Sequence, residues 1–173
     1  IDLLRPIYDA QRASILTSRV LAMDEKPIKA GRSGPGKMKE GYYWPDFGGQ
    51  NELAFPFATS RGHQHAVDIL GKYCGTLISD DYGAYEAYAA KRDEVTRASC
   101  WAHVRRKFVD AEGVEPERVA RALEGIRVIY WIEEEIRDDK LEGEANLSRA
   151  TQRPRIELQA IGSPEASTVS VHT

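Results

Sequence analysis

Two aspartates stand where two short apolar runs end. Asp24 follows residues 18–23, and Asp80 follows residues 76–79. Both runs have the length and composition of β-strands, and the sites of α/β proteins gather at the carboxyl ends of strands. If the two strands are neighbours, the carboxylates meet, and they repel each other unless a cation lies between them. Oxygen ligands of this kind suit Mg²⁺ or Mn²⁺, and such ions can promote attack on a phosphodiester.

Each of these aspartates has an acidic neighbour. Glu25 follows Asp24, and Asp81 follows Asp80. Neighbouring side chains of a strand point to opposite faces, so we expect at most one residue of each pair in a shared site. The other member would be an alternate ligand, a supporting group or a surface charge. A simpler interpretation is that each Asp only terminates its strand, because Asp is a common turn residue.

A cationic segment opens the helix that we expect to begin at Cys100. It contains His103, Arg105, Arg106 and Lys107. Arginine binds phosphate through paired, charge-assisted hydrogen bonds, and a histidine at the start of a helix could donate to a phosphate or assist proton transfer. The alternative is a solvated basic edge with a capping histidine. Cys100 and His103 could also begin a zinc site, but no second closely spaced pair completes the four ligands of a structural site.

A second cationic segment surrounds Lys37 and Lys39. Residues 26–39 hold five bases and no acid, and residues 91–107 have a net charge of +4, whereas residues 110–144 have a net charge of −7. The whole chain is mildly acidic, with a net charge of −3. It can therefore present a cationic surface to a polyanion, and Lys37 and Lys39 are candidates for contact with a nucleic-acid backbone. Chance variation among solvated loops and helix faces is the alternative.

The elements that must position these groups alternate between helices and strands. The apolar pattern predicts helices at 3–16, 63–73, 82–90, about 100–111 and about 116–139, strands at 18–23, 76–79 and 95–99, and a hairpin of strands 42–47 and 53–58. Pro45 and Pro56 indicate edge strands or bulges in the hairpin. Hairpin strands followed by β-α-β units imply a mixed sheet with helices packed on it. This order fits an α/β protein with a ribonuclease-H-like mixed sheet flanked by helices, although other α/β folds share parts of it.

Tyr82, Tyr85 and Tyr88 are spaced by three residues on one of the expected helices. Aromatic rings can stack on nucleic-acid bases. The regular spacing on one helix face favours packing in the core or at its rim.

Length and composition predict one soluble domain. The chain has 173 residues, of which 42% are hydrophobic and 29% charged, and it contains no apolar run near the ~20 residues of a membrane span. The opening residues are charged and amphipathic, so no signal sequence is expected. Two cysteines do not form a disulfide framework, which favours a cytoplasmic protein. The lack of an initial Met is consistent with a fragment.

Five short segments follow one another along the chain: VLAMDEKP at 20–27, GKMKEGYYW at 36–44, TSRGH at 59–63, SDDYGAY at 79–85 and CWAHVRRKF at 100–108. In this order and spacing they resemble the catalytic domain of bacterial insertion-sequence family sixty-six transposases. Each segment is weak alone, but five in order are specific. We therefore divide the chain into a partial DDE transposase domain with a ribonuclease-H-like fold, residues 1–141, and a weakly ordered tail, residues 142–173, that does not resemble the family.

The resemblance implies a DNA transposase that cleaves phosphodiesters and transfers strands at transposon ends. It maps the first two acids of the family onto Asp24 and Asp80, as catalytic residues and ligands of Mg²⁺ or Mn²⁺. Double-stranded DNA is then the expected partner, with self-association or other proteins of the element as further possibilities and no membrane. The expected DNA-binding residues are Lys37, Lys39, His103, Arg105, Arg106 and Lys107. A bacterial, cytoplasmic and nucleoid-associated location follows from the same resemblance.

The third acid of the family has no counterpart in this sequence. In the family it is a Glu far downstream in an Asp-Asn-Asn segment, and this chain has only two asparagines. We interpret Glu133, Glu134 and Glu135 as the polar face and end of a helix. The sequence therefore predicts a domain whose C-terminal part is missing through truncation or a frameshift, which argues against activity of this chain alone. The alternative is an inactive remnant that only binds DNA or assembles with a partner.

Overall fold

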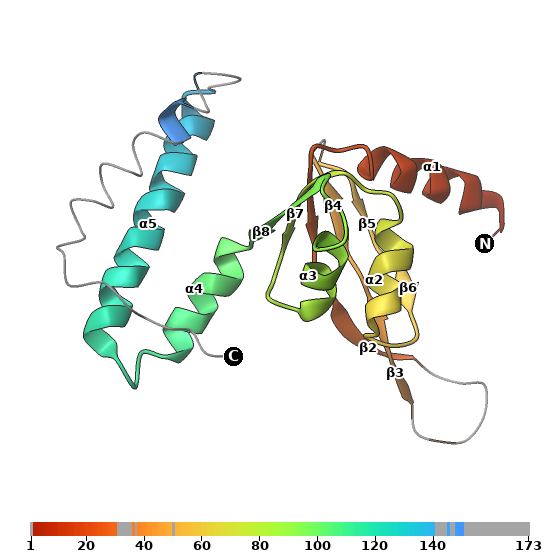
Figure 1. The fold of residues 1–173 in the computed structure, drawn as a ribbon, viewed down its shortest axis with the longest axis horizontal. Coiled ribbons are helices and arrows are strands. Elements are labelled where there is room, and N and C mark those ends of the chain that lie inside the picture. Colours follow the sequence, from red (N-terminus) through yellow and green to blue (C-terminus); the bar gives the residue numbers. More distant parts are fainter. Residues whose placement is uncertain are drawn as a thin grey trace. The chain divides into compact units, whose positions relative to one another are not determined.

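The computed structural model describes residues 2–30, 36, 38–49, 51–140, 145 and 148–150. It consists of two compact units, Ile1–Cys100 and Trp101–Thr173 (Figure 1). Lys37 and most of the expected tail lie outside the described residues.

A five-stranded mixed sheet forms the centre of the first unit. Its strands are β1 (Val20–Met23), β4 (Asp46–Gly48), β5 (Leu53–Ala54), β7 (Gly75–Ser79) and β8 (Val95–Ser99), in the order β5-β4-β1-β7-β8. The β5-β4 and β4-β1 pairs are antiparallel, whereas β1-β7 and β7-β8 are parallel. The helices of this unit are η1 (Asp2–Leu4), α1 (Arg5–Ile15), α2 (His63–Leu70) and α3 (Gly83–Ala89). This mixed sheet flanked by helices is compatible with a ribonuclease-H-like fold, as the order of elements in the sequence predicts.

A smaller sheet continues the pairing of the first one. Its strands are β2 (Lys26–Ala30), β3 (Lys39–Tyr43) and β6 (Phe57–Ala58), in the order β2-β3-β6. The register is the same on both sides of the break, because Met23 pairs with Asp46 and Lys26 pairs with Tyr43. At the break itself, the amide of Asp24 donates to the carbonyl of Pro45 at 3.3 Å. Three long chain segments thus form one antiparallel meander. Each segment is broken in the middle, so that β1, β4 and β5 belong to the main sheet and β2, β3 and β6 to the smaller one.

The predicted hairpin is confirmed in its pairing but not in its continuity. Residues 42–47 and 53–58 do pair in one register, yet they contribute to two sheets. The division falls at Pro45 and Pro56, which cannot donate a ladder hydrogen bond. The structure also contains a strand at Lys26–Ala30 and begins β3 at Lys39, and the apolar pattern predicted neither. Pro27 is tolerated there because β2 is an edge strand.

The core of the first unit lies between its main sheet and its helices. Apolar residues from β1, β7 and all three α-helices form one buried cluster. Tyr85 and Tyr88 are fully buried in it, and Tyr82 packs against it, so the tyrosines of this helix serve the core as their spacing predicts. Trp44 is also fully buried, with its ring centroid 6.1 Å from that of Tyr85. Trp44 lies between β3 and β4, so this aromatic contact joins the break in the meander to α3.

The second unit contains two α-helices, α4 (Trp101–Asp110) and α5 (Pro116–Asp138). Five apolar side chains of α5 are buried: Val119, Ile126, Val128, Ile132 and Ile136. Glu133 and Glu134 are exposed near the end of α5 and Glu135 is half-buried, which confirms their interpretation as its polar face. None of the helices in the described part of the chain combines the length and apolar character needed to cross a bilayer.

Candidate metal centre

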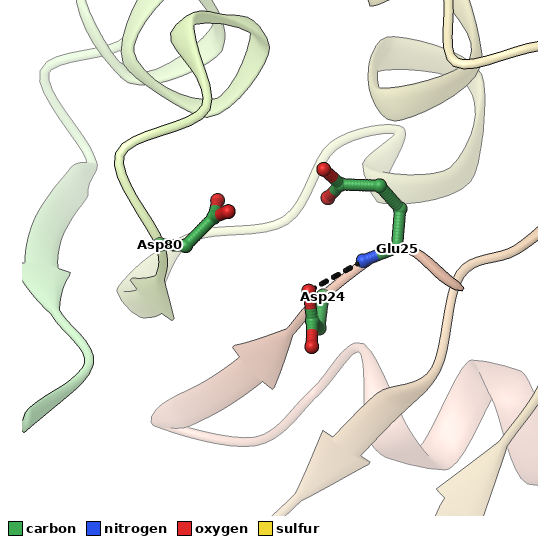
Figure 2. A group of neighbouring side chains, drawn as sticks. All are labelled: Asp24, Glu25 and Asp80. Carbon is green, nitrogen blue, oxygen red and sulfur yellow. Dashed lines mark hydrogen bonds between the residues drawn. The ribbon is translucent and has the colours of Figure 1, made fainter. Parts of the chain in front are cut away.

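The topology of the main sheet places Asp24 and Asp80 side by side. β1 and β7 are parallel neighbours in which Ala22 pairs with Ile78, so each aspartate lies two residues beyond a paired position. Glu25 joins them, and the three side chains each offer a carboxylate oxygen within 4.8 Å of the others (Figure 2). The structure thus brings together the two aspartates that the sequence singled out and adds a third acid.

Asp24 is held by its own chain on both sides of its carboxylate. Its Oδ1 accepts a hydrogen bond from the amide of Glu25 at 2.8 Å. Its Oδ2 forms an ion pair with Nζ of Lys26 at 2.6 Å. The side chain is a quarter exposed, so Asp24 is oriented and remains reachable from solvent.

Asp80 is oriented by the turn that starts α3. Its Oδ1 accepts a hydrogen bond from the amide of Tyr82 at 3.0 Å, the pattern of an Asx turn. Its carbonyl accepts from Nη1 of Arg97 on β8 at 3.2 Å. Asp81 has an exposed side chain that lies 3.9 Å from Nη2 of Arg97, and it is not part of the acidic cluster. Only one member of this pair therefore enters the cluster, as strand alternation predicts.

The same expectation is wrong for Asp24 and Glu25, because both lie in the cluster. β1 ends at Met23 and β2 begins at Lys26, so these two residues occupy the break in the meander, where strand alternation does not apply. Sequence reasoning left Glu25 among the alternates. A proline two positions later, Pro27, was the available signal that a single regular strand does not continue through this segment.

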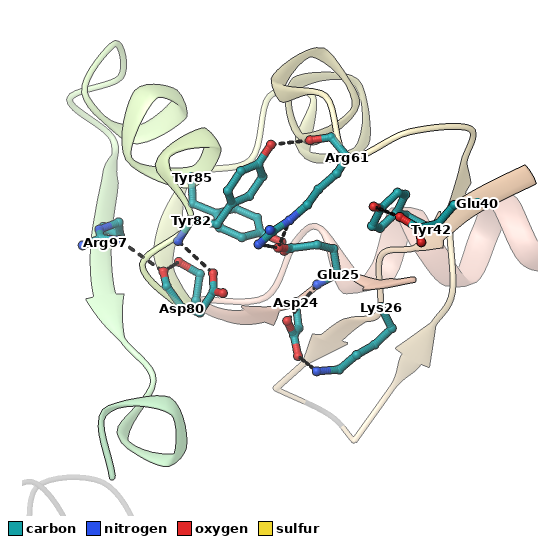
Figure 3. Close-up of polar contacts among 11 residues, drawn as sticks. Asp24, Glu25, Lys26, Glu40, Tyr42, Arg61, Asp80, Tyr82, Tyr85 and Arg97 are labelled. Carbon is teal, nitrogen blue, oxygen red and sulfur yellow. Dashed lines mark hydrogen bonds and ion pairs between the residues drawn. The ribbon is translucent and has the colours of Figure 1, made fainter. Parts of the chain in front are cut away.

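Glu25 is a buried carboxylate with both oxygens engaged. Its Oε1 accepts from Nε of Arg61 at 2.6 Å and also from Nη2 of Arg61, while its Oε2 accepts from the hydroxyl of Tyr85 at 2.9 Å (Figure 3). Burial raises the pKa of Glu25, and the hydrogen bonds from Tyr85 and Arg61 oppose that increase. Burial, with the neighbouring charge of Glu25, strongly raises the pKa of Tyr85. Tyr85 therefore keeps its proton and acts as a donor to the carboxylate.

The donor set fits a hard divalent cation. All three side chains are carboxylates, and Mg²⁺ and Mn²⁺ prefer oxygen ligands. Asp24 and Asp80 are the more accessible ligands, because both are partly exposed whereas Glu25 is buried. Cys100 and His103 do not belong to this cluster, so the zinc alternative gains no support from it.

The basic residues expected to contact DNA occupy different places. Lys39 is the exposed first residue of β3. Arg105, Arg106 and Lys107 are exposed on α4, and His103 on the same helix is half-buried. These positions are surface positions in both units, and their contact with DNA stays a prediction.

Comparison with known proteins identifies relatives along nearly the whole chain. A family model described as "Transposase IS66 family" matches residues 1–168. The uncharacterized protein y4jD of Sinorhizobium fredii (strain NBRC 101917 / NGR234) is 29% identical over 167 residues, which cover 87% of this chain and 32% of that protein. The uncharacterized protein y4qI of the same strain is 28% identical over 145 residues, covering 75% of this chain and 26% of that protein. The chain spans about a third of the length of these curated relatives, or less, and the family match extends past residue 141.

Proposed function

The chain belongs to the IS66 transposase family, and from this premise we propose that it is a DNA transposase domain of an insertion sequence. The proposed reaction is metal-dependent cleavage of a phosphodiester followed by strand transfer. One observation carries the proposal: Asp24 and Asp80 extend from neighbouring parallel strands and bring carboxylate oxygens within 4.8 Å of each other. Both residues lie inside the matched range.

Asp24 and Asp80 are the proposed catalytic residues and metal ligands. Divalent cations bound there would polarise a phosphodiester and stabilise the negative charge of its attacking and leaving oxygens. The chain contributes orientation: Lys26 holds one oxygen of Asp24, and the Tyr82 amide holds one oxygen of Asp80. Because these contacts come from the chain itself, they orient the two carboxylates for ligands.

The proposed partner is double-stranded DNA. An acidic cluster repels phosphates, so a chain that acts on DNA needs cationic groups elsewhere to hold the backbone. The basic residues of β3 and α4 are suited to that role because they are exposed. Backbone contacts of this kind position the duplex without reading its sequence.

Cation titration tests the metal assignment. The proteins to compare are wild type, Asp24→Asn, Asp80→Asn and the matched control Asp81→Asn, whose side chain is adjacent in sequence but exposed outside the cluster. We expect Mn²⁺ and Mg²⁺ affinity, measured by calorimetry, to fall roughly tenfold or more in the first two variants, since even changes to groups beyond the direct ligands cost about 10–100-fold. Asp81→Asn should bind as wild type does. Equal affinities in all four proteins would refute the assignment.

A second function is favoured by the state of Glu25. The third carboxylate of the cluster already accepts hydrogen bonds from Arg61 and Tyr85, so two carboxylates remain for ligands. A domain of this kind would bind DNA or assemble with a partner without cutting. Nicking of duplex DNA separates the two functions.

A further inference from the structure

Arg61 is fixed beside the acidic cluster, yet about half of its side chain, 47%, is exposed. Its guanidinium donates to Glu25 through Nε and Nη2. The same group lies over the ring of Tyr82, with Cζ 4.2 Å from the ring centroid. Its backbone carbonyl accepts a hydrogen bond from the Tyr82 hydroxyl (Figure 3). Arg61 is therefore held by a carboxylate, a ring and a backbone contact.

The guanidinium has donors beyond those that bind Glu25. Arginine carries five N–H groups in a fixed planar fork, and the contacts with Glu25 use Nε and Nη2. Arginine is also the side chain best matched to phosphate oxygens. A rigid, half-exposed fork loses little conformational entropy when it binds an anion.

The charge around the cluster explains why such a group is needed. Asp24, Glu25 and Asp80 bring three carboxylates together. Lys26 pairs with Asp24 and Arg61 with Glu25, whereas Arg97 donates to the backbone carbonyl of Asp80 and pairs with Asp81. A DNA phosphate that approaches these acids is repelled unless positive groups face it. Lys26 is paired with Asp24 on the β2 side, whereas Arg61 lies on the α3 side, against Tyr82.

The exposure of Arg61 leaves part of its guanidinium accessible to an anion. Burying both members of an ion pair costs desolvation, so an arginine that pairs with a buried acid can keep its charged head in water. Here the acid is buried and the base is half-exposed. Glu25 and the Tyr82 ring hold the guanidinium in place, and about half of the Arg61 side chain remains exposed to solvent.

We propose that Arg61 binds a backbone phosphate of DNA beside the acidic cluster and that Glu25 is the positioning residue that holds it there. This inference rests on the proposed function, since it requires DNA at the metal centre. It assigns to the Arg61–Glu25 pair a role separate from that of the ligands Asp24 and Asp80.

The salt dependence of duplex binding tests this assignment. Affinity for a short duplex of arbitrary sequence is measured over a range of salt concentrations with Ca²⁺ present, which accepts oxygen ligands with a looser geometry than Mg²⁺. Loss of one phosphate contact lowers the slope of log affinity against log salt by about 0.9. We expect that decrease for Arg61→Gln and a slope near wild type for Arg61→Lys, which keeps the charge.

Two further variants separate contact from charge and from folding. Arg92 is the matched control, because it also stacks on a tyrosine, with Cζ 3.9 Å from the Tyr88 ring centroid, but follows the other end of α3. Arg92→Gln removes the same charge and should keep the wild-type slope. The double variant Glu25→Gln/Arg61→Gln avoids an unpaired buried carboxylate and keeps the wild-type net charge, yet should lose about 0.9 from the slope.

The possible failures are distinguishable. If Arg61→Gln and the double variant melt cooperatively and bind with the wild-type slope, the role of Arg61 is refuted while the metal centre stands. If wild type shows no salt-dependent binding to duplex at all, the DNA partner of the proposed function is refuted as well, and the inference with it.

Discussion

At the scale of single residues, the candidate metal centre depends on the hydrogen-bond partners of its buried carboxylate, Glu25. Burial, and to a lesser degree the charge of Asp80, raises the pKa of Glu25. The buried carboxylate is accommodated because Arg61 and Tyr85 donate to its oxygens. A buried carboxylate that loses a donor is costly, since burial removes the water that would replace it. The two donors are therefore part of the stability of the fold as well as of the site.

Removal of the Tyr85 hydroxyl should destabilise the protein more than removal of its counterpart on the same helix. Tyr85 donates to a carboxylate, at 2.9 Å, whereas the equally buried Tyr88 donates to the carbonyl of Gly71, at 3.1 Å. Hydrogen bonds to charged groups contribute about 1.5–3 kcal/mol and those to neutral groups about 0.5–1.5 kcal/mol. We expect Tyr85→Phe to lower the free energy of unfolding by the larger amount and Tyr88→Phe by the smaller, as measured by urea titration. A larger loss in Tyr88→Phe would contradict this account of Glu25.

At the scale of elements, one ion pair ties α1 to the main sheet. Nε of Arg12 on α1 donates to Oδ2 of Asp46 on β4 at 3.2 Å, and its Nη2 donates to the carbonyl of Ile69 on α2 at 2.7 Å. Asp46 is fully buried. Burial raises its pKa, against the opposing charge and hydrogen bond of Arg12.

The raised pKa of Asp46 predicts a pH dependence with a definite sign. A group whose pKa is higher in the folded state contributes its stability fully below its unfolded pKa, and that contribution is lost as the pH rises through the folded pKa. Asp46→Asn does not titrate there. We therefore expect the free energy of unfolding of wild type, relative to Asp46→Asn, to fall as the pH rises from 3.8, the ordinary pKa, through the folded pKa. Urea titrations at a series of pH values measure the difference, and a difference that grows with pH would contradict the prediction.

The same scale shows what the sequence could and could not reveal. β1, β7, β8 and the long α5 follow local apolar patterns, so periodicity predicts them closely. β2 has no such pattern. Its sequence, KPIKA, contains two lysines and a proline and has no fully buried residue. The break in the meander depends on pairing between distant segments, which local patterns do not contain. Glu25 was left unassigned for this reason, whereas Asp24 and Asp80 follow strands that are visible in the sequence.

At the scale of the whole molecule, the uneven distribution of charge matters more than the total. The net charge of −3 conceals an acidic centre in the first unit and exposed bases on α4 in the second. The boundary between the compact units, at Cys100 and Trp101, falls within the segment CWAHVRRKF, which sequence reasoning treated as one motif. The predicted division at residue 141 rests on the extent of the family resemblance and stays a prediction.

Whole-molecule behaviour on DNA separates a nuclease-type activity from binding alone. We expect wild type with Mn²⁺ or Mg²⁺ to convert supercoiled plasmid to the open circle, because cleavage of one phosphodiester releases the supercoiling. Asp80→Asn should not do so, and the control Asp81→Asn should, since Asp81 lies outside the cluster. Gel electrophoresis of the plasmid gives the measurement. Salt-dependent binding without conversion in either cation would instead favour the DNA-binding function.

The shared register of the two sheets means that a pairing error in one would spread to the other. β4 pairs with β5 in the same register in which β3 pairs with β6. A slip of this pairing by one residue would exchange the faces of the whole segment, so the buried Ala54 and Ala58 would trade places with the exposed Phe55 and Phe57. A misregistered chain would therefore expose small core residues and bury two phenylalanines on both sides of the break at once.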